Sequence, residues 1–142
     1  MKIVILAPGG GYDASALPMI PTDSQVSVLG FESSPEVVGT VVPLQRLGGW
    51  RAKLTAAAAR TMLGRVLLRL TPLDPGVVYW RATQASDVAR KAIRDADLLV
   101  ASERDAAYAA WRWHRAHAKV GRQVGSVFGY PAARAAIERA SA

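Results

Sequence analysis

Residues 2–15 have the sequence KIVILAPGGGYDAS, in which an apolar run leads into three glycines. After Lys2 the run is β-branched and aliphatic with no polar alternation, which is typical of a strand buried on both faces of a parallel sheet. A glycine loop that follows the first strand of such a sheet lets a ligand approach the backbone closely. The stretch therefore predicts a central strand and a loop at the ligand-binding edge.

The rest of the chain alternates strand patterns with helix patterns. Further strands are predicted at residues 25–32, 36–44, 96–102 and 122–129. Helices are predicted at residues 14–17, 50–70, 77–95, 103–118 and 130–142, with Ser102 as an N-cap of the fourth and Pro131 in the first turn of the last. This alternation predicts one α/β domain over residues 1–142, a Rossmann-like, doubly wound and mostly parallel sheet of four to six strands with helices on both faces. Residues 2–7 and 96–101 are its expected central strands.

Composition limits the classes of protein. Of the 142 residues, 51% are hydrophobic and none is cysteine, which excludes disulfides, thiolate metal sites and a thiol nucleophile. The sequence contains no apolar run long enough to span a membrane and no secretory signal, so we expect a cytoplasmic protein, either soluble or peripheral to a membrane. The net charge of +7 attracts phosphate groups or simply follows from general residue usage. Nucleic acid is an unlikely partner, because no recognition motif accompanies the charge.

The glycine loop departs from the known nucleotide-binding fingerprints. A dinucleotide fold needs G-x-G-x-x-G at the start of a long helix, whereas Gly9, Gly10 and Gly11 are consecutive and prolines follow them. Glu32 does end the second predicted strand at a distance typical of a ribose-binding acid. No G-K-[ST] sequence is present, which excludes a P-loop. A plain turn or a substrate-contacting loop is thus favoured over a dinucleotide site, and we expect no cofactor.

Four segments carry a resemblance to a known family. They are MKIVILAPGGG (1–11), KLTAAAARTMLGRVLLRL (53–70), LTPLDPGVVYWRAT (70–83) and ADLLVASERDAAYAAW (96–111). Together they resemble the N-terminal, acceptor-side half of the GT-B glycosyltransferases. In that family the sugar nucleotide is held mainly by the C-terminal half, whose acidic and basic motifs have no counterpart here. The resemblance implies a part in glycosyl transfer together with a second domain or subunit, and a chain that is inactive alone.

The resemblance also places the glycine loop at the cleft between the two halves of such an enzyme. It implies that Gly9, Gly10 and Gly11 contact substrate, and Glu103 is a second substrate-binding candidate. Asp13 is the candidate catalytic residue, as a general base that deprotonates a sugar hydroxyl. For Glu103 and Asp105 the alternative is a purely structural role beside the helix dipole. For the whole chain the alternative is a non-catalytic binding or scaffold domain of the same fold.

The predicted helix at residues 50–70 is amphipathic and basic. Its apolar face consists of Met62, Leu63, Val66, Leu67 and Leu70. The rest of the helix surface is basic and contains no acid, and one tryptophan stands at its start. The residues that we expect to contact a membrane or a partner are Trp50, Lys53, Arg60, Arg65 and Arg69. This surface fits an anionic membrane or a lipid-linked acceptor. Alternatively, the helix packs on the sheet and its basic face is solvated.

Two histidines and two tryptophans lie close together in the segment WRWHRAH. His114 and His117 are three residues apart on one helix face, a spacing that suits a shared metal ion but lacks a nearby third ligand. We therefore expect solvated histidines and no metal. Trp111 or Trp113 is expected to be a core or interface anchor.

Overall fold

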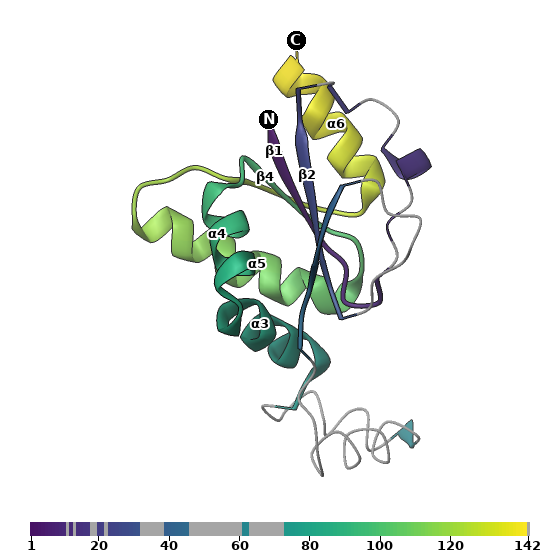
Figure 1. Cartoon of the computed structure of the whole chain (residues 1–142), viewed down its shortest axis with the longest axis vertical. Coiled ribbons are helices and arrows are strands. Elements are labelled where there is room, and N and C mark those ends of the chain that lie inside the picture. The colour runs from purple at the N-terminus through teal and green to yellow at the C-terminus, as the bar shows by residue number, and fades with distance from the viewer. Residues whose placement is uncertain are drawn as a thin grey trace.

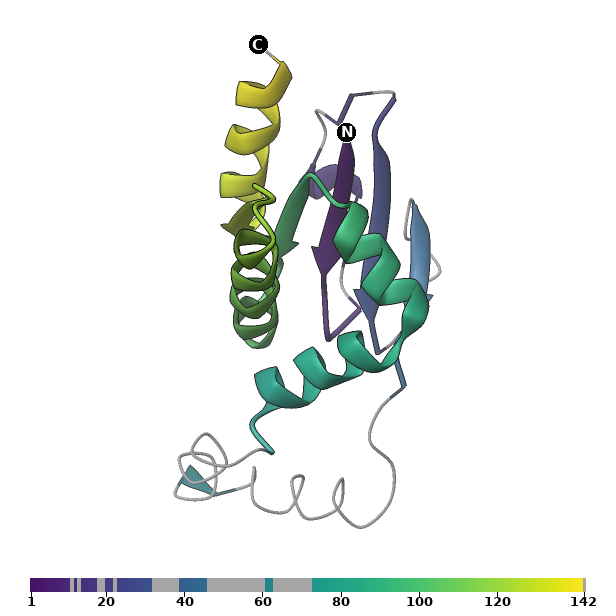
Figure 2. The same ribbon diagram turned by 90° about the vertical axis from the view of Figure 1, so that its left-hand side faces the viewer.

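The computed structural model describes residues 1–10, 12, 14–17, 20–21, 23–31, 39–45, 61–62 and 73–141. They form a parallel sheet of five strands in the order β3-β2-β1-β4-β5, with helices on both faces (Figures 1 and 2). The strands are β1 (Lys2–Leu6), β2 (Gln25–Gly30), β3 (Thr40–Pro43), β4 (Leu98–Ala101) and β5 (Gly125–Phe128). The predicted fold class is confirmed.

The two strands expected at the centre of the sheet are both interior strands. β1 pairs with β2 on one side and β4 on the other, so that Ile5 lies opposite Val28 and Val100. All four residues of β4 are buried, and in β1 only Lys2 is exposed. Burial on both faces explains why these strands lack polar alternation.

The helices divide between the two faces of the sheet. The helices are α3 (Pro75–Ala85), α4 (Asp87–Asp95), α5 (Arg104–Lys119) and α6 (Tyr130–Ser141), and η1 (Ala14–Ala16) is a short 3₁₀ helix. One hydrophobic cluster joins α3, α4 and α5 to β1, β2 and β4, whereas Ala133 and Ile137 of α6 pack with Ile3 and Ile5 on the opposite face. α3 lies across the carboxyl ends of the strands (Figure 2).

The helix predicted at residues 77–95 is in fact two helices, so that prediction is wrong in its continuity. Ser86 has an extended backbone, with φ −91° and ψ 119°, and it ends α3. Its side-chain oxygen accepts a hydrogen bond from the backbone N–H of Ala89 at 3.3 Å and so caps α4. A serine that caps the second helix favours this break over a continuous helix.

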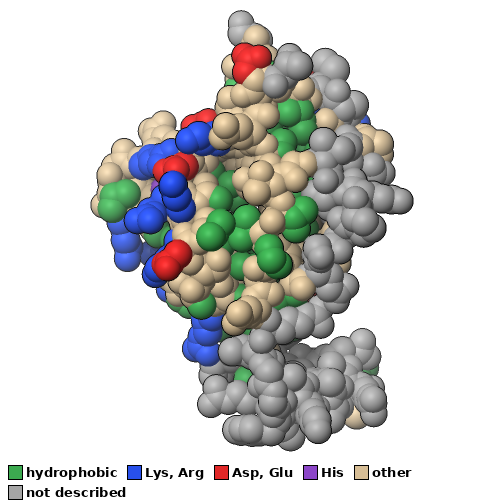
Figure 3. Space-filling view, in the orientation of Figure 1, with side chains coloured by type: hydrophobic (Ala, Val, Ile, Leu, Met, Phe, Trp, Pro, Cys, Tyr) green, Lys and Arg blue, Asp and Glu red, His purple; other side chains and the backbone are tan. Residues whose placement is uncertain are grey.

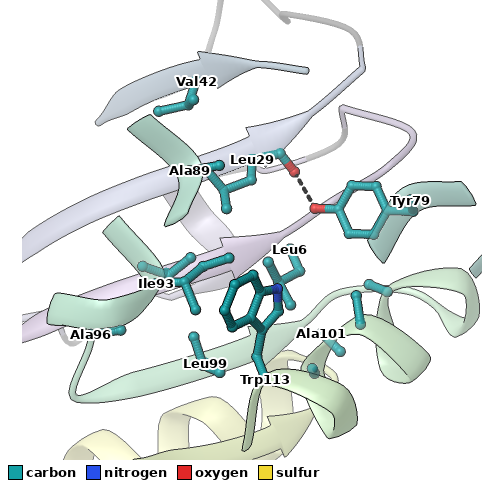
Figure 4. Packing of buried hydrophobic residues seen from close by; sticks show 14 of the residues in the cluster. Leu6, Leu29, Val42, Tyr79, Ala89, Ile93, Ala96, Leu99, Ala101 and Trp113 are labelled. Carbon is teal, nitrogen blue, oxygen red and sulfur yellow. Dashed lines mark hydrogen bonds between the residues drawn. The ribbon is translucent and has the colours of Figure 1, made fainter. Parts of the chain in front are cut away.

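Two aromatic side chains fix α3 and α5 onto the sheet (Figure 4). The hydroxyl of Tyr79 donates a hydrogen bond to the carbonyl of Leu29 at 2.7 Å, although its ring is entirely buried. The indole N–H of Trp113 donates to the hydroxyl of Thr83 at 2.9 Å. Each ring thus fills the core while its polar atom finds a partner. The prediction that one of the two tryptophans is a core anchor is confirmed for Trp113, whereas Trp111 is exposed.

The two C-terminal helices begin differently from one another. Pro131 is the second residue of α6, as predicted. α5 has Glu103 rather than Ser102 at its N-cap position, and Glu103 makes no side-chain capping bond. The prediction of Ser102 as the cap is wrong, because its hydroxyl instead donates to the carbonyl of Leu6 at 3.0 Å.

The amphipathic helix predicted at residues 50–70 falls outside the described residues, except for positions 61 and 62. Its membrane-facing candidates Trp50, Lys53, Arg60, Arg65 and Arg69 therefore stay predictions. Within the described part of the chain, none of the helices combines the length and the apolar character needed to cross a bilayer.

Candidate functional site

The carboxyl ends of β1 and β4 form the topological switch point of the sheet. From β1 the chain order runs outward to β2 and β3 on one side, and to β4 and β5 on the other. The loops that follow β1 and β4 therefore diverge, which leaves the crevice where open α/β sheets bind their ligands. Residues 7–10 follow β1 here, and Ser102 and Glu103 follow β4.

The loop after β1 contains one position, Gly10, whose backbone angle favours glycine. Gly10 has φ +79°, and its N–H closes a turn on the carbonyl of Ala7 at 2.9 Å. A Cβ atom at Gly9 would lie 3.1 Å from Oε1 of Glu103. The backbone angle favours glycine at position 10, whereas a side chain at position 9 would require the carboxylate of Glu103 to shift by a few tenths of an ångström.

Glu103 joins the two loops of the switch point. Its Oε1 accepts a hydrogen bond from the backbone N–H of Gly9 at 2.8 Å, across 94 positions of sequence. The side chain is only partly buried. An ionised carboxylate is purely an acceptor with several lone pairs, so one bond from the loop leaves capacity for a ligand hydroxyl or amine. The structure therefore brings Gly9 and Glu103 into direct contact, whereas their predicted role in binding substrate stays a prediction.

A second set of contacts fixes the geometry of this edge. The backbone N–H of Ser102 donates to the carbonyl of Leu6 at 3.1 Å, and the serine hydroxyl donates to the same oxygen. The N–H of Ala7 donates to the carbonyl of Leu29 at 2.9 Å. Because the ends of β1, β2 and β4 are bonded to each other, Glu103 and the glycine loop are held by rigid elements.

Tyr79 lies beside the glycine loop and was not identified from the sequence. Burial raises the pKa of the Tyr79 hydroxyl above its ordinary value. The backbone N–H of Ala7 lowers this pKa in part, whereas the charge of Glu103 raises it further. Tyr79 is therefore a neutral hydrogen-bond donor that supports the end of β2. No local motif distinguishes it in the sequence, where it is one aromatic residue of an apolar segment.

The start of α3 is packed tightly against the start of α5. Asp74 caps α3 by accepting hydrogen bonds from Gly76 N–H at 2.8 Å and Val77 N–H at 3.3 Å. A Cβ at Gly76 would lie 3.1 Å from the carbonyl of Asp105. Asp105 is in the first turn of α5, as its predicted role beside the helix dipole requires.

Two other predicted residues of this site, Gly11 and the catalytic candidate Asp13, lie outside the described residues, as does Glu32. The next described residue after the loop, Tyr12, is buried, and its ring packs against that of Tyr130 with centroids 6.2 Å apart. The catalytic role of Asp13 stays a prediction.

The two histidines of α5 have different environments. The Nδ1 of His114 lies 3.1 Å from the carbonyl of Val124. His117 is buried, and its Nε2 has no hydrogen-bond partner in the structure. The prediction of two solvated histidines is thus wrong for His117, because that position faces inward, near the backbone of Ile93 in α4. Among the described residues no three His, Asp or Glu side chains gather as metal ligands would.

No protein-family model matches this chain, and neither the curated proteins nor the solved structures yield a match to it.

Proposed function

We propose that this chain binds a hydroxyl-bearing acceptor at the β1–β4 switch point and contributes the acceptor side of a glycosyl transfer. A second domain or subunit would then supply the sugar nucleotide. The proposal rests on the resemblance of the sequence to the acceptor-side half of GT-B glycosyltransferases and on one contact. That contact is the hydrogen bond of 2.8 Å from Gly9 N–H to the carboxylate of Glu103.

This contact favours a hydroxyl ligand over a phosphate. In phosphate-binding loops the backbone N–H groups point at the anion and favour negative charge. Here the Gly9 N–H already bonds a carboxylate, which would repel a second anion at the same place. A sugar hydroxyl, by contrast, is a donor that an acceptor-only carboxylate can bind.

In glycosyl transfer the acceptor oxygen forms a bond to the anomeric carbon, the bond to the nucleotide breaks, and the hydroxyl proton goes to a base. Glu103 would orient the acceptor by accepting its hydrogen bond. Asp13, in the same loop of the sequence, is the candidate for the base. Because the donor-binding half is not recognisable in the sequence, we expect no turnover of sugar nucleotides by the chain alone.

Titration of the ¹⁵N-labelled chain with a panel of neutral glycosides tests the proposal. We expect at least one glycoside to shift the amide resonances of Gly9, Gly10 and Ser102. Glu103→Gln keeps an oxygen for the Gly9 N–H but removes the charge, so we expect weaker binding with an intact loop. Glu138→Gln, on the exposed part of α6, removes the same charge elsewhere and should leave binding unchanged. Shifts of these amides by nucleotides but not by glycosides would contradict the proposal.

A second candidate is a non-catalytic binding domain that docks a partner chain. It is favoured by an apolar hollow between α5 and the edge strand β5, where Trp111 and Phe128 are exposed by 47% and 59%. Exposed aromatic groups beside a free strand edge are typical of an interaction surface. Under this candidate Phe128→Ser abolishes partner capture, whereas Glu103→Gln leaves it unchanged.

A further inference from the structure

A groove separate from the switch point lies between α3 and α5. Its volume is about 230 Å³, and among the described residues it is lined by Trp80, Gln84, Arg112, Trp113, Arg115, Ala116 and Lys119. The two indole rings and Ala116 give it apolar surface, and α5 supplies three cations along one side. No acid is part of this lining, so the groove is both aromatic and positively charged.

One of the cations is held in a fixed orientation. The guanidinium of Arg112 stacks over the ring of Trp80, 4.1 Å from its centroid, and donates to the hydroxyl of Tyr108 at 3.5 Å. Trp80 and Tyr108 are themselves packed edge to face, with centroids 6.2 Å apart. A planar guanidinium that is already ordered binds an anion at a smaller entropic cost than a free side chain.

Among the described residues, Arg115 and Lys119 of α5 have no acidic partner, although the guanidinium of Arg115 lies over the ring of Trp111, 5.0 Å from its centroid. On α4, Arg90 forms a salt bridge with Asp87 one turn away. On α5, Arg115 and Lys119 are four residues apart and both positive, a spacing that destabilises an isolated helix slightly. Both also line the groove, where an anion would neutralise them. In Figure 3 the Lys and Arg side chains gather on the side of the molecule that α4 and the end of α5 occupy.

We propose that the α3–α5 groove binds a small aromatic phosphate of the nucleoside monophosphate class, with its phosphate on Arg115 and Lys119 and its flat ring on the guanidinium plane of Arg112, which itself stacks on Trp80. Arg residues recognise phosphate oxygens with paired donors, and a guanidinium plane held against an aromatic ring accepts a planar base by stacking. Gln84 offers an amide donor and acceptor for the edge of the ring. The volume of the groove fits one such unit rather than a larger ligand. The site is independent of the proposed glycoside site at the β1–β4 edge.

The probes are adenosine monophosphate, adenosine and inorganic phosphate, titrated into the ¹⁵N-labelled chain at low salt. Trp113 lines the groove and its indole N–H donates to Thr83, so its resonance reports changes in the groove. We expect adenosine monophosphate to shift the Trp80 and Trp113 indole resonances saturably. Adenosine and inorganic phosphate should each bind at least ten-fold more weakly.

The double variant Arg115→Gln with Lys119→Gln should weaken binding of adenosine monophosphate at least ten-fold. Lys91→Gln with Arg94→Gln removes the same charge from exposed positions of α4 outside the groove, and should change binding less than two-fold. Far-ultraviolet circular dichroism checks that both variants are folded. If a variant fails to fold, the comparison of the three probes on the wild-type chain still decides the proposal.

The proposal is overturned if adenosine monophosphate does not bind saturably, or if both pairs of variants lose binding equally, which would indicate attraction by net charge alone. It is equally overturned if inorganic phosphate or adenosine binds as tightly as the monophosphate. Shifts confined to Gly9, Gly10 and Ser102 would place the ligand at the switch point and not in this groove.

Discussion

The two ends of α5 carry side chains of opposite charge in different surroundings. At its start, the carboxylate of Glu103 is bonded by the backbone of a loop that is 94 residues away in sequence. In its second half, Arg115 and Lys119 line a groove in which the described residues include no acid. The first group is fixed by the sheet, because β1 and β4 are neighbours. The second is set by the spacing of residues along one helix and by the packing of α3 beside it.

This difference separates two kinds of candidate site. The carboxylate of Glu103 already accepts one hydrogen bond from the backbone, so it can bind a ligand only through its remaining oxygen lone pairs. Those lone pairs accept a hydrogen bond, which suits a ligand hydroxyl. Cations beside aromatic rings, with no acid among the described residues of the groove, select by charge and shape together, which suits an aromatic anion. The four predictions below test whether the two ends of α5 are as independent as their contacts indicate, and they run from the largest expected effect to the smallest.

Replacement of Trp113 should affect both ends of α5, because its ring anchors the helix on the sheet. Trp113→Ala removes a buried aromatic side chain and its hydrogen bond to Thr83. We expect a loss of about 3–5 kcal/mol in the free energy of unfolding, measured by urea denaturation. Trp113→Phe fills more of the same space and should cost clearly less. A loss below about 1 kcal/mol for Trp113→Ala would mean that α5 is anchored by other contacts.

Replacement of Glu103 should affect only the first end. Glu103→Ala leaves the Gly9 N–H without its carboxylate partner and should destabilise the chain by about 1 kcal/mol, with faster exchange of the Gly9 amide hydrogen. Glu103→Gln retains an acceptor oxygen and should lose less than half as much. If the alanine and glutamine variants were equally stable, the hydrogen bond to the loop would not be what holds this edge together.

His117, in the last turn of α5, provides a pH-dependent probe of that end of the helix. Burial lowers the pKa of His117 below its ordinary value, and the charges of Arg122 and His114 lower it further, whereas a backbone interaction with Ile93 acts in the opposite sense. The unfolded chain thus binds a proton more readily than the folded chain, so stability is complete above about pH 6.5 and falls as the pH decreases toward the folded-state pKa.

Urea denaturation at pH 7.5 and pH 5 measures this dependence. We expect the loss of stability between the two pH values to be larger in the wild type than in His117→Met, which cannot titrate at this position. His114→Gln removes the other histidine of α5 and should keep most of the wild-type dependence. A wild type and a His117→Met variant with the same pH dependence would show that His117 does not titrate with folding.

Lys119→Gln should have the smallest effect, because its contributions oppose one another. Lys119 repels Arg115 one turn away, but as the last residue of α5 it also interacts favourably with the helix dipole. We expect the free energy of unfolding to change by less than about 0.5 kcal/mol in urea denaturation. A loss above about 1 kcal/mol would show that this lysine is structural, and would weaken its use as a test of ligand binding.

Much of the fold follows from local patterns in the sequence. The run at residues 2–7 and the run at residues 96–101 predicted the two interior strands because burial on both faces leaves no room for alternating polar residues. Pro131 marked the start of α6, and the alternation of strands with helices predicted a parallel sheet. The break at Ser86 was missed, although serine followed by Asp87 is a typical start of a helix, because the segments on both sides were interpreted as one continuous helix.

The candidate sites depended on tertiary structure to different degrees. Gly9, Gly10 and Glu103 were identified from the sequence by their places after predicted strands, although their direct bond was not foreseen. Tyr79 and the burial of His117 were not identified, because both depend on which face of a helix meets the sheet. The α3–α5 groove also was not foreseen, since it requires Trp80 and Arg112 from separate helices to lie side by side.

The sequence by itself determined the class of fold, the central strands and the glycine turn, because burial periodicity and the backbone freedom of glycine act over a few residues. Only the tertiary structure decided which polar groups meet. Gly9 and Glu103 are joined because β1 and β4 are adjacent in the sheet, and Arg112 stacks on Trp80 because α3 packs against α5. Such contacts form between residues that are distant along the chain, and the order of strands and the packing of helices set them, which no local pattern specifies.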